Sequence, residues 1–470
     1  MSRKLQDSTW DNQAFNLTSK QSDQSLAEFD LSMWSMLKML SEQDNEFWIE
    51  EFKFSKASVQ ALVDSQLKDL ELLSSGEILS FTVKNDEKEI IKILGEPCGP
   101  DIIYKKILGP NKPMAHQYWN LAKRFAERAD NEEENLYDVS LQFGLNLDVL
   151  KALKNCTDNQ IFCLAETIDT KFGIRFDESL IHRILKSHFD PKNNIHVLIM
   201  LKFQQTISSS IGLNTGREMV YSNNNLLTLK QFSDSDNNNR LSKHSLVRTL
   251  LARYLLISGS AVNIVQIETG YTQKNIYRLR SIIQADGIKI KNNRSKSQMS
   301  AISIITNINK SIQASLVMVL YYFHSQSYEN IPIDQNLNLI PLLRAYRSFH
   351  QIMNVTQFFD SDKGLVKKSP PIDFSECWTL ARELRSNEAC ILKSTQFNCF
   401  YFSSQNQKVS TDCPFESPLN EITNVGNSKK VNITYLKDEF GDYDVPNLLA
   451  DDEILRIGPY NNSHIRFIPD

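Results

Sequence analysis

The stretch LAETIDTKFGIRFDE, Leu164 to Glu178, has a counterpart earlier in the same chain. When Phe143 is set over Phe52, an offset of 91 residues, two 43-residue segments align without a gap, and the quoted stretch falls on LSSGEILSFTVKNDE, Leu73 to Glu87. Any two amphipathic helices share a period, but here a Phe-x-(Ile/Val) motif, an aspartate and an Ile-x-x-Ile-Leu run also keep their spacing. We therefore predict an internal duplication.

The whole chain has the length and composition of a globular protein with roughly three domains. It has 470 residues, 41% of them hydrophobic, and a formal charge of −4. The longest apolar run, Ser315 to Phe323, is too short to span a membrane, and the polar N-terminus does not resemble a signal peptide. We expect a cytoplasmic protein that does not bind membranes, with its seven cysteines mostly as buried thiols.

Helical periodicity dominates the chain, so the expected fold class is mainly α. Helices are predicted at 31–40, at 55–73 with Ser55 as N-cap, and in the short apolar segment 195–203. Composition and the internal repeat divide the chain into a disordered N-terminus at 1–27, a first repeat at 28–95, a second repeat at 113–190, a helix and linker at 191–241, a further helical domain at 242–416 and a tail at 417–470.

Positive charge is concentrated between Arg240 and Lys296. This segment holds eleven basic residues, opposed only by Glu268 and Asp286, so its formal charge is +9 in a chain of net charge −4. Such an asymmetry indicates a face that binds a polyanion.

Within this segment the residues predict a helix-turn-helix arrangement. A helix over 261–268 would end at Gly270 in a left-handed turn, and Thr272 would cap a second helix with Ile276, Leu279, Ile282 and Ile283 on its apolar side. The outward face would then present side chains suited to base edges and phosphates of duplex DNA. The candidate DNA-binding residues are Thr272, Gln273, Lys274, Asn275, Tyr277, Arg278, Arg280, Lys289, Lys291, Arg294 and Lys296.

No motif predicts catalysis. The eight histidines are scattered, and the chain has no H-E-x-x-H, Walker or G-x-S-x-G sequence, so we expect a protein that is not an enzyme. The nearest metal-like feature is the pair Cys399 and Cys413.

Two sets of residues resemble a known family, the FlhDC flagellar master activators. Residues 118–177 are similar to FlhD in Tyr118-x-x-Leu121-Ala122-x-Arg124, Phe143-Gly144-Leu145-Asn146, Leu164-Ala165-Glu166-Thr167 and Arg175-Phe176-Asp177. Residues 31–94 look like a worn first copy, with Lys53 in place of the turn glycine. The later region resembles FlhC in Gly259, Glu268-Thr269, Arg278-Leu279, Gly287, Ala345-Tyr346-Arg347, Trp378-Thr379-Leu380 and Arg382.

The resemblance implies two tandem helical FlhD-like modules followed by a helical FlhC-like DNA-binding domain with a degenerate zinc-ribbon-like C-terminal part. It implies a transcriptional activator that binds double-stranded DNA as a homodimer and contacts RNA polymerase. The family's zinc site uses four cysteines, of which Cys399 and Cys413 would be remnants, with Gln396 and Glu416 in the places of lost partners. Zinc therefore stays open, as do two rival functions: sequestration of FlhD- or FlhC-type subunits, and RNA binding.

Overall fold

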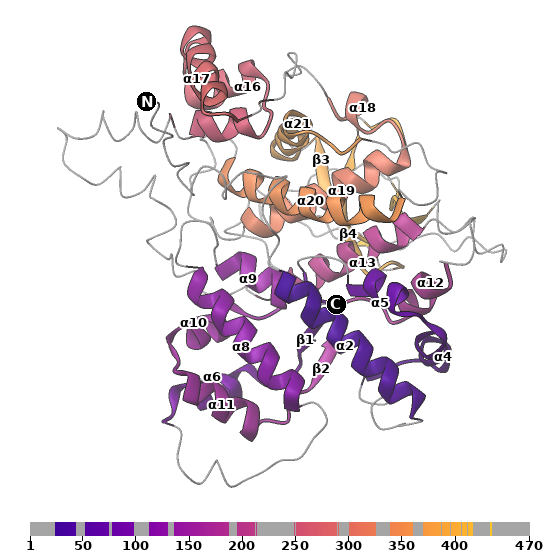
Figure 1. Ribbon diagram of the computed structural model, residues 1–470. Helices are drawn as coiled ribbons and strands as arrows, with labels where there is room; N and C mark the ends of the chain where they lie inside the picture. The colour runs from indigo at the N-terminus through magenta and orange to yellow at the C-terminus, as the bar shows by residue number, and fades with distance from the viewer. Residues whose placement is uncertain are drawn as a thin grey trace, which may run out of the picture.

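A computed structural model describes residues 24–43, 52–74, 78–97, 112–129, 136–187, 195–211, 213, 249, 251–288, 290, 300–325, 339–360, 370–386, 388–394, 396–405, 407–410, 412–416 and 433–434. The fold is mainly helical, as the periodicity predicts, with two small sheets (Figure 1). None of the described helices is long and apolar enough to cross a membrane.

The first half of the structure repeats one order of elements at the predicted 91-residue offset. Each copy has two short helices, a three-residue strand and a closing helix. The pairs are α4 (Lys56–Asp64) with α10 (Leu147–Asn155), α5 (Leu67–Ser74) with α11 (Asp158–Thr167), β1 (Phe81–Val83) with β2 (Phe172–Ile174), and α6 (Glu87–Gly95) with α12 (Ser179–Ser187).

The two strands pair antiparallel about a local two-fold axis. Thr82 lies opposite Gly173, its own counterpart 91 residues later. The flanking backbone bonds are reciprocal: the Lys84 amide donates to the Lys171 carbonyl at 2.8 Å, and the Arg175 amide donates to the Ser80 carbonyl at 2.9 Å. The repeats are thus related as the two subunits of a symmetric dimer would be, within one polypeptide.

Each repeat gives its closing helix to the other. Helix α6 packs on α10 and α11, whereas α12 packs on α4 and α5. Since an amphipathic helix must bury its apolar stripe, neither copy completes its core alone. The longer helices α2 (Gln24–Glu42) and α8 (Lys112–Arg128) contact each other beside the two-stranded ribbon of β1 and β2. Helix α9 (Leu136–Phe143) precedes α10.

Two predictions about the first repeat are wrong in detail. The segment 55–73 forms two helices, because Ser65 ends the first and the Asp69 carboxylate accepts from the Gln66 amide at 2.7 Å to begin the second. The first described helix begins at Gln24, so the predicted disordered N-terminus, 1–27, extends too far; burial of Leu26 and Phe29 stabilises this start. Ser55 caps α4 as predicted.

Helix α13 (Ile195–Ser210) joins the repeats to the rest of the protein. It is longer than the predicted 195–203 and is buried along nearly its whole length, including polar side chains. The Gln205 amide group donates to the Asp177 carboxylate and to the Phe397 carbonyl, each at 2.6 Å. The Gln204 amide donates to the Phe400 carbonyl at 2.6 Å. These bonds fix the second repeat to the C-terminal hairpin.

The C-terminal half is built around one apolar helix. Helix α19 (Ile308–Ser325) packs on α20 (Leu339–Asp360), on α21 (Phe374–Arg385) and on the hairpin of β3 (Ala389–Ser394) and β4 (Cys399–Ser404). The short α18 (Ala301–Ile304) contacts α21. Strand β5 (Ile433–Thr434) pairs with β3, so the predicted tail, 417–470, contributes to this sheet.

Candidate nucleic-acid interface

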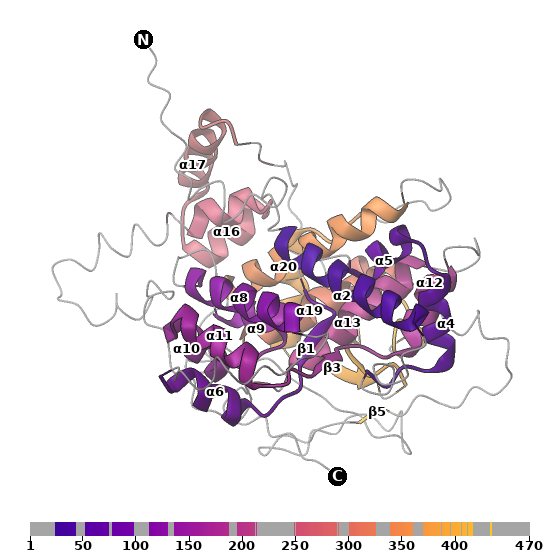
Figure 2. The same ribbon diagram turned by 60° about the horizontal axis from the view of Figure 1, so that its bottom comes forward.

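Two helices of the basic segment are joined by a tight turn. Helix α16 (Val262–Thr269) ends at Gly270, whose φ of 68° is left-handed, and α17 (Gln273–Ala285) packs back on α16. In both views of the molecule these helices project from the main body (Figures 1 and 2). The predicted helix-turn-helix arrangement is present.

Local chemistry explains where α17 begins. A residue without a Cβ adopts positive φ at low cost, so Gly270 allows the chain to reverse after α16. The Thr272 hydroxyl then accepts from the Asn275 amide at 3.4 Å and caps α17 as predicted. The start of α17, where a helix dipole favours phosphate, therefore lies at the turn.

Helix α17 buries a narrow stripe and exposes the rest. Ile276, Leu279 and Ile283 are buried against the domain. Ile282, predicted on the same apolar side, is instead 47% exposed. At 100° per residue Ile282 lies beside, and not within, the stripe of α17 that packs on α16.

The outward face has the predicted composition. Gln273, Lys274, Tyr277 and Arg278 are exposed, and the Gln273 amide donates to the Tyr277 hydroxyl at 3.2 Å. Asn275 is also exposed, whereas Arg280 is half-buried and already interacts with another group of the protein. The remaining candidates, Lys289, Lys291, Arg294 and Lys296, lie outside the described residues.

The two acidic residues of the basic segment do not pair with Lys274 or Arg278. The Glu268 carboxylate accepts from the Trp378 indole nitrogen at 2.8 Å, and Asp286 pairs with Arg253 at 3.2 Å. Neither Lys274 nor Arg278 has an ion pair in the described part of the chain. The charges of Lys274 and Arg278 are therefore not neutralised by any described residue.

Helix α16 is fixed to the body through α21. Besides the bond between Glu268 and Trp378, the Ala261 amide donates to the Ser375 hydroxyl at 3.0 Å. The Arg382 guanidinium lies 5.4 Å from the centre of the Trp378 ring. Two short motifs of the FlhC resemblance, Glu268-Thr269 and Trp378-Thr379-Leu380, thus meet in space.

The possible zinc remnants lie together but do not form a metal site. Cys399 and Cys413 are both buried, and burial together with the neighbouring Cys413 thiol raises the pKa of Cys399. Gln396 is exposed and Glu416 is half-buried. Among the residues that the structure describes, no three His, Cys, Asp or Glu side chains converge. Since structural zinc takes four ligands, the described residues do not fit it.

The other described cysteines are consistent with small buried hydrophobes in most cases. Cys156 and Cys377 are buried thiols outside any disulfide, and Cys390 is half-buried and likewise not disulfide-bonded. Cys163 is disulfide-bonded, which the spacing of the cysteines does not predict.

Sequence reasoning missed one cluster of charges at the junction of the repeats. Asp30, Arg175 and Lys202 are each less than 5% exposed. Burial raises the pKa of Asp30 to about 6 and lowers that of Lys202 to about 8. The sequence does contain one indication of this cluster: Lys202 is a charged residue in the otherwise apolar run IHVLIMLKF, and a buried charge requires a partner.

Comparison with known proteins adds no identification: no family model, curated protein or solved structure matches the chain.

Proposed function

We propose that this chain is a sequence-specific transcription regulator of the FlhDC type, which activates transcription by binding duplex DNA through α17. The observation that carries the proposal is the capped α17, which follows a left-handed glycine and presents Lys274, Tyr277 and Arg278 to solvent. Arginine and lysine pair with guanine edges, and glutamine with adenine, when such a helix enters a major groove.

The arrangement of charge supports duplex DNA as the ligand. The segment 240–296 has a formal charge of +9, and its two acids are engaged with Trp378 and Arg253. A polyanion at α17 would therefore meet Lys274 and Arg278, which have no ion pair with a described residue. The exposed face has Tyr277 as its one aromatic side chain, whereas single-strand binders use several aromatic rings for stacking, so RNA is the weaker candidate.

The FlhD-like and FlhC-like assignment rests on the order of the short motifs and on their contacts. Tyr118 of one FlhD-like motif donates to the carbonyl of Phe143 in another at 3.2 Å, and Arg175 of a third donates to the carbonyls of Leu141 and Gln142. Two symmetry-related repeats followed by one DNA-binding unit would make each chain half of a complex. A homodimer would then present two copies of α17, and fusion keeps the modules at high effective concentration.

DNA binding is tested by selection and titration. The full chain is used to enrich duplexes from a random-sequence pool, and the enriched duplex is titrated by fluorescence anisotropy at several salt concentrations. We expect affinity to fall steeply with salt. Arg278→Ala should weaken binding by about 1–3 kcal/mol, and Lys274→Ala should reduce the salt slope by about 1.

The matched control is Lys88→Ala, which removes an exposed lysine from α6. It should leave affinity and salt slope unchanged. The proposal is overturned if no duplex is enriched and binding does not depend on salt, or if the three variants behave alike.

Sequestration of FlhD- or FlhC-type subunits is the second candidate function. It is favoured by the cysteine pair, since Cys399 and Cys413 lack the further ligands of the family's zinc site in the described residues. Pull-down of purified FlhD or FlhC by this chain, with and without DNA, separates the two functions. Capture of a subunit without any duplex binding would replace the first proposal by the second.

A further inference from the structure

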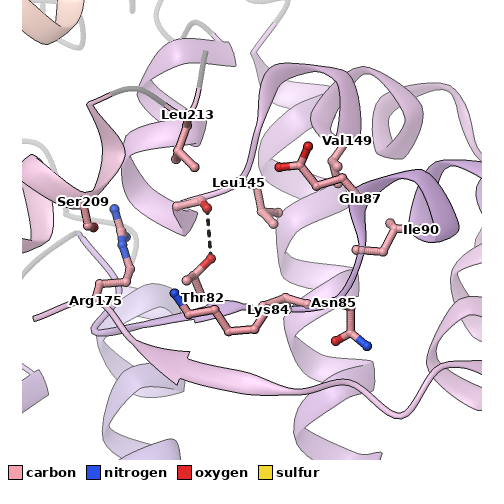
Figure 3. A pocket seen from close by; sticks show the side chains of 12 residues that line it. Thr82, Lys84, Asn85, Glu87, Ile90, Leu145, Val149, Arg175, Ser209 and Leu213 are labelled. Carbon is pink, nitrogen blue, oxygen red and sulfur yellow. Dashed lines mark hydrogen bonds between the residues drawn. The ribbon is translucent and has the colours of Figure 1, made fainter. Parts of the chain in front are cut away.

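A pocket of about 210 Å³ lies at the junction of the two repeats. The ribbon of β1 and β2, the start of α6, the turn before α10 and the end of α13 surround it (Figure 3). Its lining therefore comes from both repeats and from the helix that joins them to the C-terminal half.

One side of the pocket is formed by the Arg175 guanidinium. The Arg175 side chain is buried, its Nη1 donates to the carbonyls of Leu79 and Gln142, and its Nη2 donates to the Ser210 hydroxyl at 2.6 Å. Its Nε has no hydrogen-bond partner among the described residues. A Cβ at Gly144 would lie 2.8 Å from that Nε, so the glycine is what lets the guanidinium pass so close to the turn.

A second cation lies on the same side. Lys84, the counterpart of Arg175 in the first repeat, extends over Gly173, where a Cβ would lie 2.6 Å from its Cε. Figure 3 shows its ammonium and the Arg175 guanidinium on the same side of the pocket, away from Glu87. No described residue gives the ammonium a hydrogen bond or ion pair. Partial burial, and then the charge of Arg175, lower the pKa of Lys84.

The remaining lining is one acid, a few neutral polar groups and an apolar wall. The acid, Glu87, accepts from the Asn146 amide at 2.7 Å. The Thr82 hydroxyl donates to the Gly144 carbonyl at 2.9 Å. The wall consists of Val83, Ile90, Leu145, Val149 and Leu213. The pocket thus has a cationic side and an aliphatic side.

We propose that this pocket binds a small organic monocarboxylate, with its carboxylate beside Lys84 and Arg175 and its aliphatic part on the wall. Two cations against one engaged acid leave a net positive lining, which an anion neutralises. The volume is below the roughly 300–1,000 Å³ of sites for drug-sized ligands, so a short chain fits better than a large metabolite. The inference does not rest on the proposed DNA binding.

Bound ligand would stabilise the junction of the repeats. Ser209, in the last turn of α13, and Leu213, just after it, line the pocket together with residues of both repeats. A ligand that binds only the folded protein raises its stability by mass action. Binding should therefore raise the unfolding midpoint of the full chain.

The experiment uses the full chain with butyrate as probe, followed by isothermal titration calorimetry and thermal unfolding at matched ionic strength. Butyramide serves as the neutral analogue and inorganic phosphate as an anion without an aliphatic part. We expect butyrate to bind and to raise the unfolding midpoint. Both analogues should bind at least about tenfold more weakly, because butyramide lacks the negative charge and phosphate lacks the aliphatic part.

Two variants on the same ribbon make the test specific. Lys84→Gln should weaken butyrate binding about tenfold, or about 1.4 kcal/mol, because a charge-assisted hydrogen bond is replaced by a neutral one. Lys171→Gln removes the charge of another exposed lysine, outside the pocket lining, and should bind butyrate like the unmodified chain. The proposal is overturned if butyrate does not bind, if butyramide or phosphate binds as tightly, or if the two variants have equal affinity.

Discussion

The Glu178 carboxylate accepts hydrogen bonds from both the backbone amide and the hydroxyl of Ser55, at 2.7 and 2.6 Å, although 123 residues separate the two. The same relationship occurs in reverse, since Glu87 accepts from the side chain of Asn146 at 2.7 Å. Ser55 and Asn146 are the N-caps of α4 and α10. Each repeat therefore supplies an acid that fixes the first short helix of the other.

Glu178→Gln tests this exchange. The variant keeps the shape of the side chain but removes the charge, so we expect a loss of about 1–2 kcal/mol in the free energy of unfolding, measured in urea. Glu89→Gln, an exposed glutamate on α6, is the control and should have little effect. Equal midpoints for the two variants would show that the bonds to Ser55 contribute nothing.

The pH dependence of the same variant has a defined sign. Burial alone would raise the pKa of Glu178, but hydrogen bonds from Ser55 and Ser58 outweigh it and lower the pKa below 4.5. An acid whose pKa is lower in the folded state stabilises the fold at pH values above its ordinary pKa. That contribution is lost as the pH falls through the lowered pKa. The stability difference between Glu178→Gln and the unmodified chain should therefore shrink under acid conditions.

The sequence predicted the repeat and the turn-and-helix of the basic segment because both depend on local signals. Apolar spacing shows the 91-residue offset, and Gly270 and Thr272 mark the turn and the cap. The exchange of α6 and α12 was not predictable, since the same apolar stripe could pack within a repeat or across to the other. Packing also explains Ile282, which has helical spacing but is left 47% exposed by the described residues.

Lys53→Gly should stabilise the protein. Lys53 has a φ of 56°, close to the 66° of its counterpart Gly144, so the left-handed turn persists in a residue with a Cβ. Since that conformation costs about 1 kcal/mol or more for such residues, glycine should raise the free energy of unfolding by about 0.5–1 kcal/mol after its greater chain entropy is counted.

Gly144→Ala is the opposite change at the equivalent position. It should destabilise by more than Lys53→Gly stabilises, because strain at positive φ is added to the contact with Arg175. Urea unfolding of both variants gives the comparison. Destabilisation by Lys53→Gly would mean that the lysine side chain makes contacts that outweigh the backbone strain.

Asp30→Asn should change how stability varies with pH. Burial raises the pKa of Asp30 to about 6 from 3.8, against the lowering effects of Lys202, Ser80 and Arg175. An acid with a raised pKa contributes stability below 3.8 that is lost as pH rises through about 6. The unmodified chain should lose on the order of 2–3 kcal/mol from this group across that range.

The measurement is the slope of unfolding free energy against pH between 4 and 6, the range that the Asp30 shift defines. The slope should be less steep in Asp30→Asn, whatever the absolute stability of the variant. Asparagine still offers an acceptor to the Ser80 amide, which bonds Asp30 at 2.9 Å. Identical slopes in the two proteins would show that groups other than Asp30 cause the change of stability between pH 4 and 6.

Trp378→Phe should loosen the basic two-helix unit without unfolding the protein. The variant keeps an aromatic ring beside Arg382 but removes the indole donor to Glu268, a bond of 2.8 Å that joins α21 to α16. A hydrogen bond to a charged group contributes about 1.5–3 kcal/mol, so local opening of α16 should become about tenfold or more frequent. Hydrogen exchange of the α16 amides measures this opening, with α11, in the second repeat, as the internal reference. Unchanged protection of α16 would mean that its packing, and not the bond to Trp378, holds it on α21.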